Sequence, residues 1–124
     1  MATDHVESLR QVRRLLGQLS RELPGPMGGF ARLHTASQAD GALPRSVKEL
    51  MAMAIAIAVH CEGCITYHMS DALQAGATEE EVVEAIGVAV MMGGGPGTVY
   101  GAEALAALRQ LLAAGAGERP LGGD

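Results

Sequence analysis

The sequence predicts an all-α protein that forms a single domain. In every long segment the apolar residues recur at the i, i+3, i+4 spacing of a helix. No segment shows the alternation of polar and apolar residues that is typical of a half-buried strand. Proline and glycine clusters separate these segments. The chain has 124 residues, which is enough for one core. We therefore expect one domain over residues 1–124, with about six helices.

The first predicted helix covers about residues 4–21 and has an amphipathic pattern. Its apolar positions are Val6, Leu9, Val12, Leu15, Leu16 and Leu19. The prolines and glycine of residues 23–26 end it. A short second helix is expected over 27–37, followed by a loop at 39–41.

The third predicted helix begins near Pro44, because proline suits the first helical position, and it ends near Val59. Apolar residues occupy both of its sides, so we expect it to be buried all round. Residues 54–59 alternate small and branched side chains as a strand does. Both sets are apolar, however, and the pattern extends back to Pro44, which exceeds normal strand length.

The fourth predicted helix covers 61–74 and ends at Ala75-Gly76. The fifth begins after Thr78, with Glu81 at the capping-box position, and continues to Met92. The glycine-rich run 93–97 predicts a sharp break, and a last helix follows from about Thr98. The core is expected over about 28–114, and a frayed tail over 115–124.

Composition excludes several classes of function. The net charge is −5 and no Lys/Arg cluster occurs, which argues against nucleic-acid binding. The longest apolar run, 50–59, is far shorter than the ~20 residues of a membrane span, and the N-terminus lacks an export signal. We expect a cytoplasmic protein that binds no membrane. Apolar residues make up 48% of the chain, a surplus that predicts an oligomer.

The candidate site comprises Cys61, Cys64 and His68, which lie at i, i+3 and i+7 along one helical stripe. Two thiols three residues apart can close on each other, and the imidazole can move a proton. The positive end of the helix dipole and a Cys-x-x-Cys pair both stabilise a thiolate. In a cytoplasmic protein such a pair is more often catalytic or metal-binding than structural.

Glu49 is a possible partner of His68. If the third and fourth helices run antiparallel, Glu49 lies ~15 Å and His68 ~10 Å from the connecting turn, at ~1.5 Å per residue. The ~5 Å difference can be spanned by two side chains or one water. In contact, the carboxylate would orient the imidazole and stabilise its charged form.

Four other interpretations remain open: inert packing, a non-redox lyase with Glu49 and His68 as acid and base, a stress-linked partner protein whose thiols respond to oxidation without turnover, and a zinc module. The zinc ligands would be Cys61, Cys64 and His68, with Glu49 or His60 as the fourth. Dithiol chemistry without metal or cofactor is favoured, because structural zinc usually supports small loop-rich domains and this chain has an ample helical core. The remaining histidines and tyrosines are interpreted as surface, helix-end or packing residues: His5, His34, His60, Tyr67 and Tyr100.

The arrangement Glu49, eleven residues, then Cys61-x-x-Cys64-x3-His68 resembles the core motif of the AhpD-like alkylhydroperoxidases in the carboxymuconolactone decarboxylase superfamily. Residues 43–50, 75–81 and 91–96 resemble the family's flanking segments, so the resemblance covers about 28–108. It implies an AhpD-like all-helical fold around a central helical hairpin, assembled as a homotrimer or homohexamer.

The resemblance also implies a peroxidase cycle. Cys64 would attack a hydroperoxide, Cys61 would close the disulfide, and His68 with Glu49 would relay protons. The implied reductant is a dithiol such as that of a lipoyl-bearing protein. The best-known AhpD proteins carry a histidine just before the second cysteine, where this chain has Gly63. The decarboxylases of the superfamily act on a lactone acid and generally lack the cysteine pair.

Overall fold

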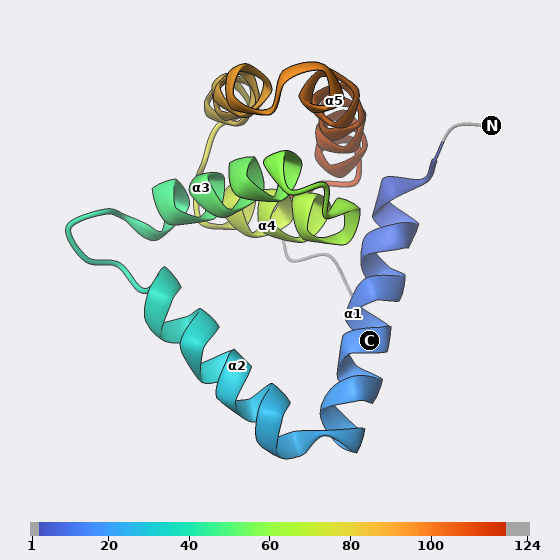
Figure 1. Cartoon of the computed structure of the whole chain (residues 1–124), viewed down its shortest axis with the longest axis vertical. Helices are drawn as coiled ribbons and strands as arrows, with labels where there is room; N and C mark the ends of the chain where they lie inside the picture. Colours follow the sequence, from blue (N-terminus) through green and yellow to red (C-terminus); the bar gives the residue numbers. More distant parts are fainter. Residues whose placement is uncertain (1–2, 119–124) are drawn as a thin grey trace.

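The computed structural model describes residues 3–118, and these form five α-helices and no strand (Figure 1). The helices are α1 (His5–Glu22), α2 (Pro24–Gln38), α3 (Arg45–Ala58), α4 (Glu62–Gln74) and α5 (Glu79–Ala113). The all-α prediction is confirmed, but the predicted count of about six helices is wrong. The fifth and sixth predicted helices are two halves of α5.

The two halves of α5 meet at a kink at Gly94, where φ is 67° and ψ is −148°. This backbone conformation is open essentially to glycine alone, and it reverses the chain without a separate loop (Figure 1). The second half then packs against the first. A Cβ atom at buried Gly101 would lie 2.9 Å from Val90 Cγ2, so the close approach requires glycine.

Helices α3 and α4 form the central antiparallel hairpin, and α5 covers one of its faces (Figure 1). A three-residue connection joins them, in which the Cys61 N–H donates to the carbonyl of Ala56 at 2.9 Å. The largest fully buried apolar side chains come from α1, α3, α4 and α5: Leu9, Met53, Ile57, Met69, Val82, Leu108 and Leu111. The hairpin therefore holds the centre of the core.

Helix α3 is not buried all round, contrary to the prediction. Met51 and Ile55 are about half exposed and Val59 at its end is two-thirds exposed. One chain supplies neighbours for only part of this helix. The same holds for the arm formed by α1 and α2, which diverge from the hairpin and meet at their far ends (Figure 1).

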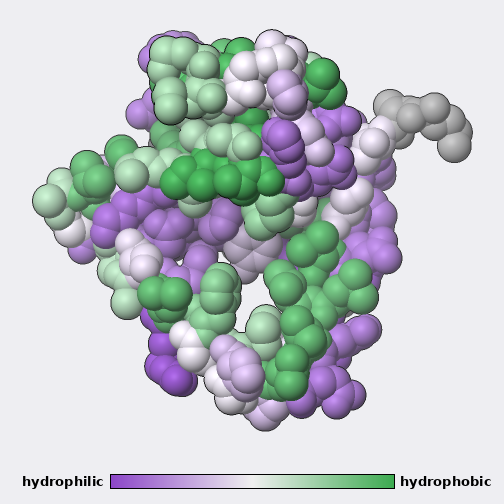
Figure 2. Space-filling model, viewed as in Figure 1, coloured by the Kyte–Doolittle hydropathy of each residue, from purple (hydrophilic) through white to green (hydrophobic). Residues whose placement is uncertain are grey.

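The arm leaves apolar surface uncovered. No residue of α2 is buried, and Phe30 and Leu33 are 61% and 62% exposed. Leu16 and Leu19 of α1 are also exposed. Figure 2 shows apolar side chains along both helices around an open gap between them. Helix α2 begins at Pro24, three residues before the predicted start, because Pro24 occupies the first helical position.

Caps fix the helix ends near the hairpin. The Thr78 hydroxyl accepts from the Glu81 N–H, and the Glu81 carboxylate accepts from the Thr78 N–H, so the predicted capping box is confirmed. Gly76 ends α4 with φ of 104°. Residues 115–118 of the predicted tail form turns, and Ala116 is buried. Residues 119–124 lie outside the described part.

Among the described residues, α5 alone is long and apolar enough to cross a membrane by length and composition. This is weak evidence for a span, because core helices of other proteins have the same features. The kink at Gly94 also folds the helix back on itself, so it does not run straight for its whole length.

Candidate functional site

The two cysteines form a disulfide at the N-terminus of α4, with their Cα atoms 5.2 Å apart. Cys61 is the N-cap residue of α4, whereas the prediction had placed it inside the helix. Its Sγ accepts a hydrogen bond from the Cys64 N–H at 3.3 Å. Both sulfurs thus lie where unpaired backbone N–H groups favour a negative charge.

Glu49 and His68 are in direct contact across the α3–α4 hairpin. Glu49 is fully buried, and its Oε1 lies 2.8 Å from His68 Nδ1. A carboxylate can only accept, so Nδ1 donates and Nε2 is left to exchange a proton. Gln38 Nε2 of α2 donates to the same oxygen at 2.9 Å. The arrangement fixes the plane of the imidazole and its tautomer.

The second carboxylate oxygen of Glu49 is less well satisfied. Its Oε2 is buried and has no hydrogen-bond partner among the described residues. Arg45, one turn earlier on α3, places Nε 3.6 Å away, which is an ion pair but too long for a hydrogen bond. Buried carboxylate oxygens are normally paired, so this atom is a feature to be explained.

His34 belongs to the site, and its predicted surface position is wrong. It is half-buried on α2, and its ring centroid lies 5.7 Å from that of His68 and 6.4 Å from that of Tyr67. Its Nε2 is buried without a hydrogen-bond partner in the described part of the chain. The loop between α2 and α3 brings α2 back against the hairpin, which places His34 there.

Asp71 and Tyr67 complete the polar cluster on α4. Burial, followed by the negative charge of Glu49, raises the pKa of the Asp71 carboxyl, while Arg13 of α1 opposes this from 3.7 Å. Burial also raises the pKa of Tyr67, which keeps its phenol protonated. The Arg13 guanidinium lies over the Tyr67 ring, 5.4 Å from its centroid. The site therefore holds two carboxylates, of which Glu49 is fully buried and Asp71 half-buried.

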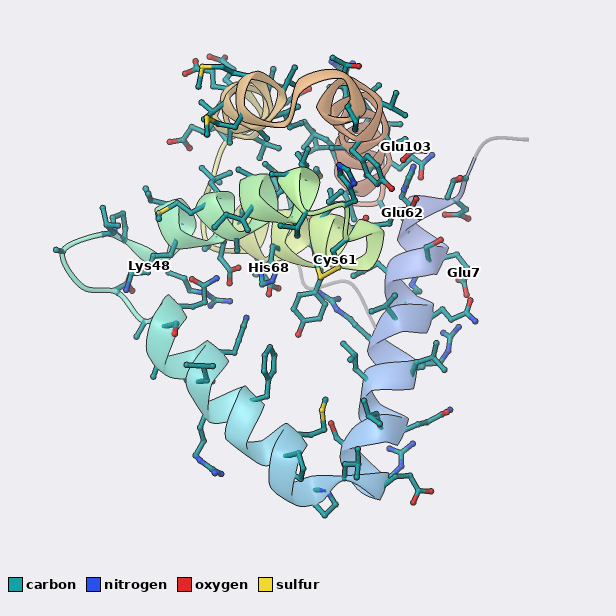
Figure 3. The ribbon with its side chains drawn as sticks, viewed as in Figure 1. Glu7, Lys48, Cys61, Glu62, His68 and Glu103 are labelled. Atoms are coloured by element: carbon teal, nitrogen blue, oxygen red, sulfur yellow. A yellow bond between two sulfur atoms is a disulfide. The ribbon has the colours of Figure 1, made fainter. Side chains whose placement is uncertain are left out.

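The cysteine pair and His68 lie on the same side of α4, facing the gap between α1 and α2 (Figure 3). His60 lies in the connection between α3 and α4 with φ of 63°, and its ring stacks on Tyr100 of α5 at 4.5 Å. This stacking on α5 does not favour a role for His60 as a fourth zinc ligand or as a replacement for the histidine absent at position 63. A Cβ at Gly63 would lie 3.4 Å from Val12 Cγ2, because α1 packs against this position.

The sequence analysis missed His34, Gln38 and Asp71. Asp71 could have been found, since it follows His68 by three residues and continues the stripe of Cys64 and His68. His34 and Gln38 are four residues apart on one face of α2, but no sequence pattern relates α2 to α4. Their positions depend on the tertiary fold.

Comparison with known proteins agrees with this architecture. Residues 24–110 match the carboxymuconolactone decarboxylase family. An uncharacterized protein of Cupriavidus necator is 40% identical over 86% of this chain and 94% of its own. Uncharacterized protein 4 in the cox locus of Paracoccus denitrificans is 36% identical over 84% of this chain and 94% of its own.

Solved structures show the same fold. A carboxymuconolactone decarboxylase family protein of Legionella pneumophila superposes with a TM-score of 0.81 at 41% identity, covering 87% of this chain and 97% of its own. A Thermotoga maritima family member, for which a part in the antioxidative response has been suggested, gives 0.67 at 30% identity over 72% of this chain and 92% of its own. The chain thus belongs to the carboxymuconolactone decarboxylase family, within the superfamily that includes the AhpD-like proteins.

Proposed function

We propose that this protein is a thiol-dependent peroxidase of the AhpD-like type, which reduces hydroperoxides with Cys61 and Cys64. One observation carries the proposal. A disulfide at the start of α4 lies one turn before a histidine that is hydrogen-bonded to a fully buried glutamate. A reversible dithiol and an oriented proton carrier are the two components that such a cycle requires. The antioxidative role suggested for the Thermotoga relative is consistent with it.

Cys64 is the proposed nucleophile because it lies four residues before His68 on α4, so their Cβ atoms are about 5–6 Å apart. The Cys64 thiolate attacks one oxygen of the hydroperoxide, and the O–O bond breaks. Sulfur becomes a sulfenic acid, and the departing alkoxide takes a proton from His68 to give the alcohol. Glu49 accepts from Nδ1, so Nε2 of neutral His68 first takes the proton of the Cys64 thiol, and the resulting imidazolium donates this proton from Nε2 to the alkoxide.

Cys61 then resolves the sulfenic acid. Its sulfur attacks Cys64, the disulfide forms, and the hydroxide leaves as water after protonation. The peroxide has gained two electrons and the thiol pair has lost two. An external dithiol, for which a lipoyl-bearing protein is the proposed source, returns them by thiol–disulfide exchange. The cycle needs no bound cofactor, and the cytoplasm, where such reductants are kept reduced, is its proposed location.

Assembly is part of the proposal. Phe30, Leu33 and Ile55 are apolar and more than half exposed in a single chain. Monomeric proteins rarely leave so many large apolar side chains uncovered, so we propose a homotrimer or homohexamer. Light scattering during size-exclusion chromatography tests this point directly. A monomer at micromolar concentration would contradict it.

The test of the cycle is a stopped-flow hydroperoxide assay with dihydrolipoamide on the wild type, Cys61→Ser and Cys64→Ser. We expect turnover in the wild type alone. Cys61→Ser should accumulate a sulfenic acid that dimedone traps, and Cys64→Ser should not. Equal, slow peroxide consumption in all three proteins would refute the peroxidase proposal.

The same variants separate the alternatives. Lactone-acid decarboxylation that survives Cys64→Ser would favour a non-redox lyase using Glu49 and His68. Stoichiometric zinc in reduced protein, lost from both serine variants, would favour the metal module through the thiols. In the disulfide state the two sulfurs are already bonded to each other and cannot serve as thiolate ligands.

A further inference from the structure

Four potential metal ligands converge beside the disulfide, and the proposed peroxidase cycle uses only two of them. They are His34 of α2, Glu49 of α3, and His68 and Asp71 of α4. One ligand atom from each residue lies within 4.8 Å of the corresponding atoms of the other three. Three helices therefore bring two imidazoles and two carboxylates to one point.

We propose that His34, Glu49, His68 and Asp71 form a binding site for a divalent transition-metal ion, with Zn²⁺ as the best-fitting member of this class. Two imidazoles and two carboxylates suit the borderline ions, which take mixed nitrogen and oxygen ligands. Four ligands at about 2.1 Å would lie about 3.4 Å apart in a tetrahedron. The observed spacing reaches this with side-chain movements of about 1 Å.

Two orphaned atoms point to a missing cation. Glu49 is fully buried and its Oε2 lacks a hydrogen-bond partner, and the buried Nε2 of His34 lacks one as well, among the described residues. The carboxylate oxygen has free lone pairs, and Nε2 has one in the tautomer of His34 that carries its proton on Nδ1. Buried polar atoms without partners are uncommon in native proteins. One metal ion bound between these two neighbouring side chains would give both atoms a partner.

The charges around the site leave room for a cation. Glu49 is buried and Asp71 half-buried, and one arginine lies at ion-pair distance from each carboxylate. Arg45 lies 3.6 Å from Glu49 Oε2, with its side chain 44% exposed, so it can move into solvent when a metal binds. Arg13 lies 3.7 Å from Asp71 Oδ1 and can stay over Tyr67. At His68, the metal would replace the Nδ1 proton now shared with Glu49.

This site differs from the thiol-based zinc site considered above. It uses no cysteine, so it is available while Cys61 and Cys64 are joined. It also does not depend on the peroxidase proposal, because binding can be measured without turnover. The disulfide form of the protein is therefore the material for the test.

The experiment is a titration of oxidised full-length protein with Zn²⁺ alone, by calorimetry and by competition with a chromophoric chelator. The variants are Asp71→Asn and His34→Gln, with His5→Gln as the matched control outside the cluster. We expect one Zn²⁺ per chain for the wild type and for the control. Each cluster variant should bind at least about 10-fold more weakly.

Co²⁺ provides a second measurement that distinguishes the two zinc sites. In oxidised protein it should give the visible d–d bands of a tetrahedral nitrogen and oxygen site, without thiolate charge-transfer bands. Absence of binding to oxidised wild type would overturn the proposal. So would equal affinity in the wild type and both cluster variants, or cobalt spectra that appear only after reduction and carry thiolate bands.

Discussion

Replacing Glu49 by glutamine tests the proposed role of the buried carboxylate in proton transfer. The amide has the shape of the carboxylate, so the variant can keep a hydrogen bond with His68 or with Gln38. In the wild type these two contacts are 2.8 Å and 2.9 Å long. What disappears is the negative charge. Without it, the imidazolium that forms when His68 takes a proton has no buried counter-ion.

The magnitude follows from the change in hydrogen-bond type. A hydrogen bond to a charged group contributes about 1.5–3 kcal/mol and a neutral one about 0.5–1.5 kcal/mol, so the loss is about 1–2 kcal/mol. Because Glu49 is fully buried, solvent does not screen this difference. We expect Cys64 oxidation to slow by about 5- to 30-fold in Glu49→Gln.

The assay is stopped-flow oxidation of the reduced protein by an organic hydroperoxide, with thermal unfolding measured on the same samples. Glu84→Gln, the same change at an exposed position of α5, is the matched control and should behave as the wild type. A rate within twofold of the wild type, in a variant that unfolds at the same temperature, would refute the proposed role of the Glu49 charge in stabilising the His68 imidazolium.

Three further predictions concern glycines, each measured by denaturant unfolding. Gly94→Ala should lower the free energy of unfolding by about 1–3 kcal/mol because of the positive φ, whereas Gly95→Ala, with a negative φ and open space, should not. Equal effects at the two positions would contradict the kink. Gly101→Ala should cost about 1–2 kcal/mol through the clash with a valine methyl, while Gly87→Ala, with nothing within 4 Å, should gain about 0.5–1 kcal/mol. If Gly101→Ala and Gly87→Ala changed the free energy of unfolding in the same direction, this would mean that the halves of α5 do not pack closely. Gly63→His, which restores the residue of the best-known relatives, should cost about 1–3 kcal/mol because α1 occupies that space; unchanged stability would show that α1 yields easily.

The central hairpin could be predicted from the sequence because its information is local. A rise of about 1.5 Å per residue and a short turn at residues 59–61 put Glu49 and His68 within reach, and the structure has them in contact. The Cys61–Cys64 pair was identified by spacing alone. Apolar periodicity indicated α1, α3, α4 and α5, each of which buries residues in the core.

The positions of His34 and Gln38 could not be predicted, because α2 carries no buried stripe that would fix its orientation. Its place against α4 depends on a loop at residues 39–44 whose path the sequence does not specify. The kink in α5 was recognised as a break from its glycines. That the two halves join at a kink without an intervening loop, however, depends on the backbone angles of Gly94.

Helix α2 has a consequence for any measurement on dilute protein. It contributes Gln38 and His34 to the site, yet its own chain buries none of its residues. The side chains of His34 and Gln38 are therefore held in the site by a helix whose apolar face is exposed in a single chain. In the proposed oligomer a second subunit would cover that face, so the proposed activity and metal affinity should fall together when samples are diluted below the concentration at which such subunits separate.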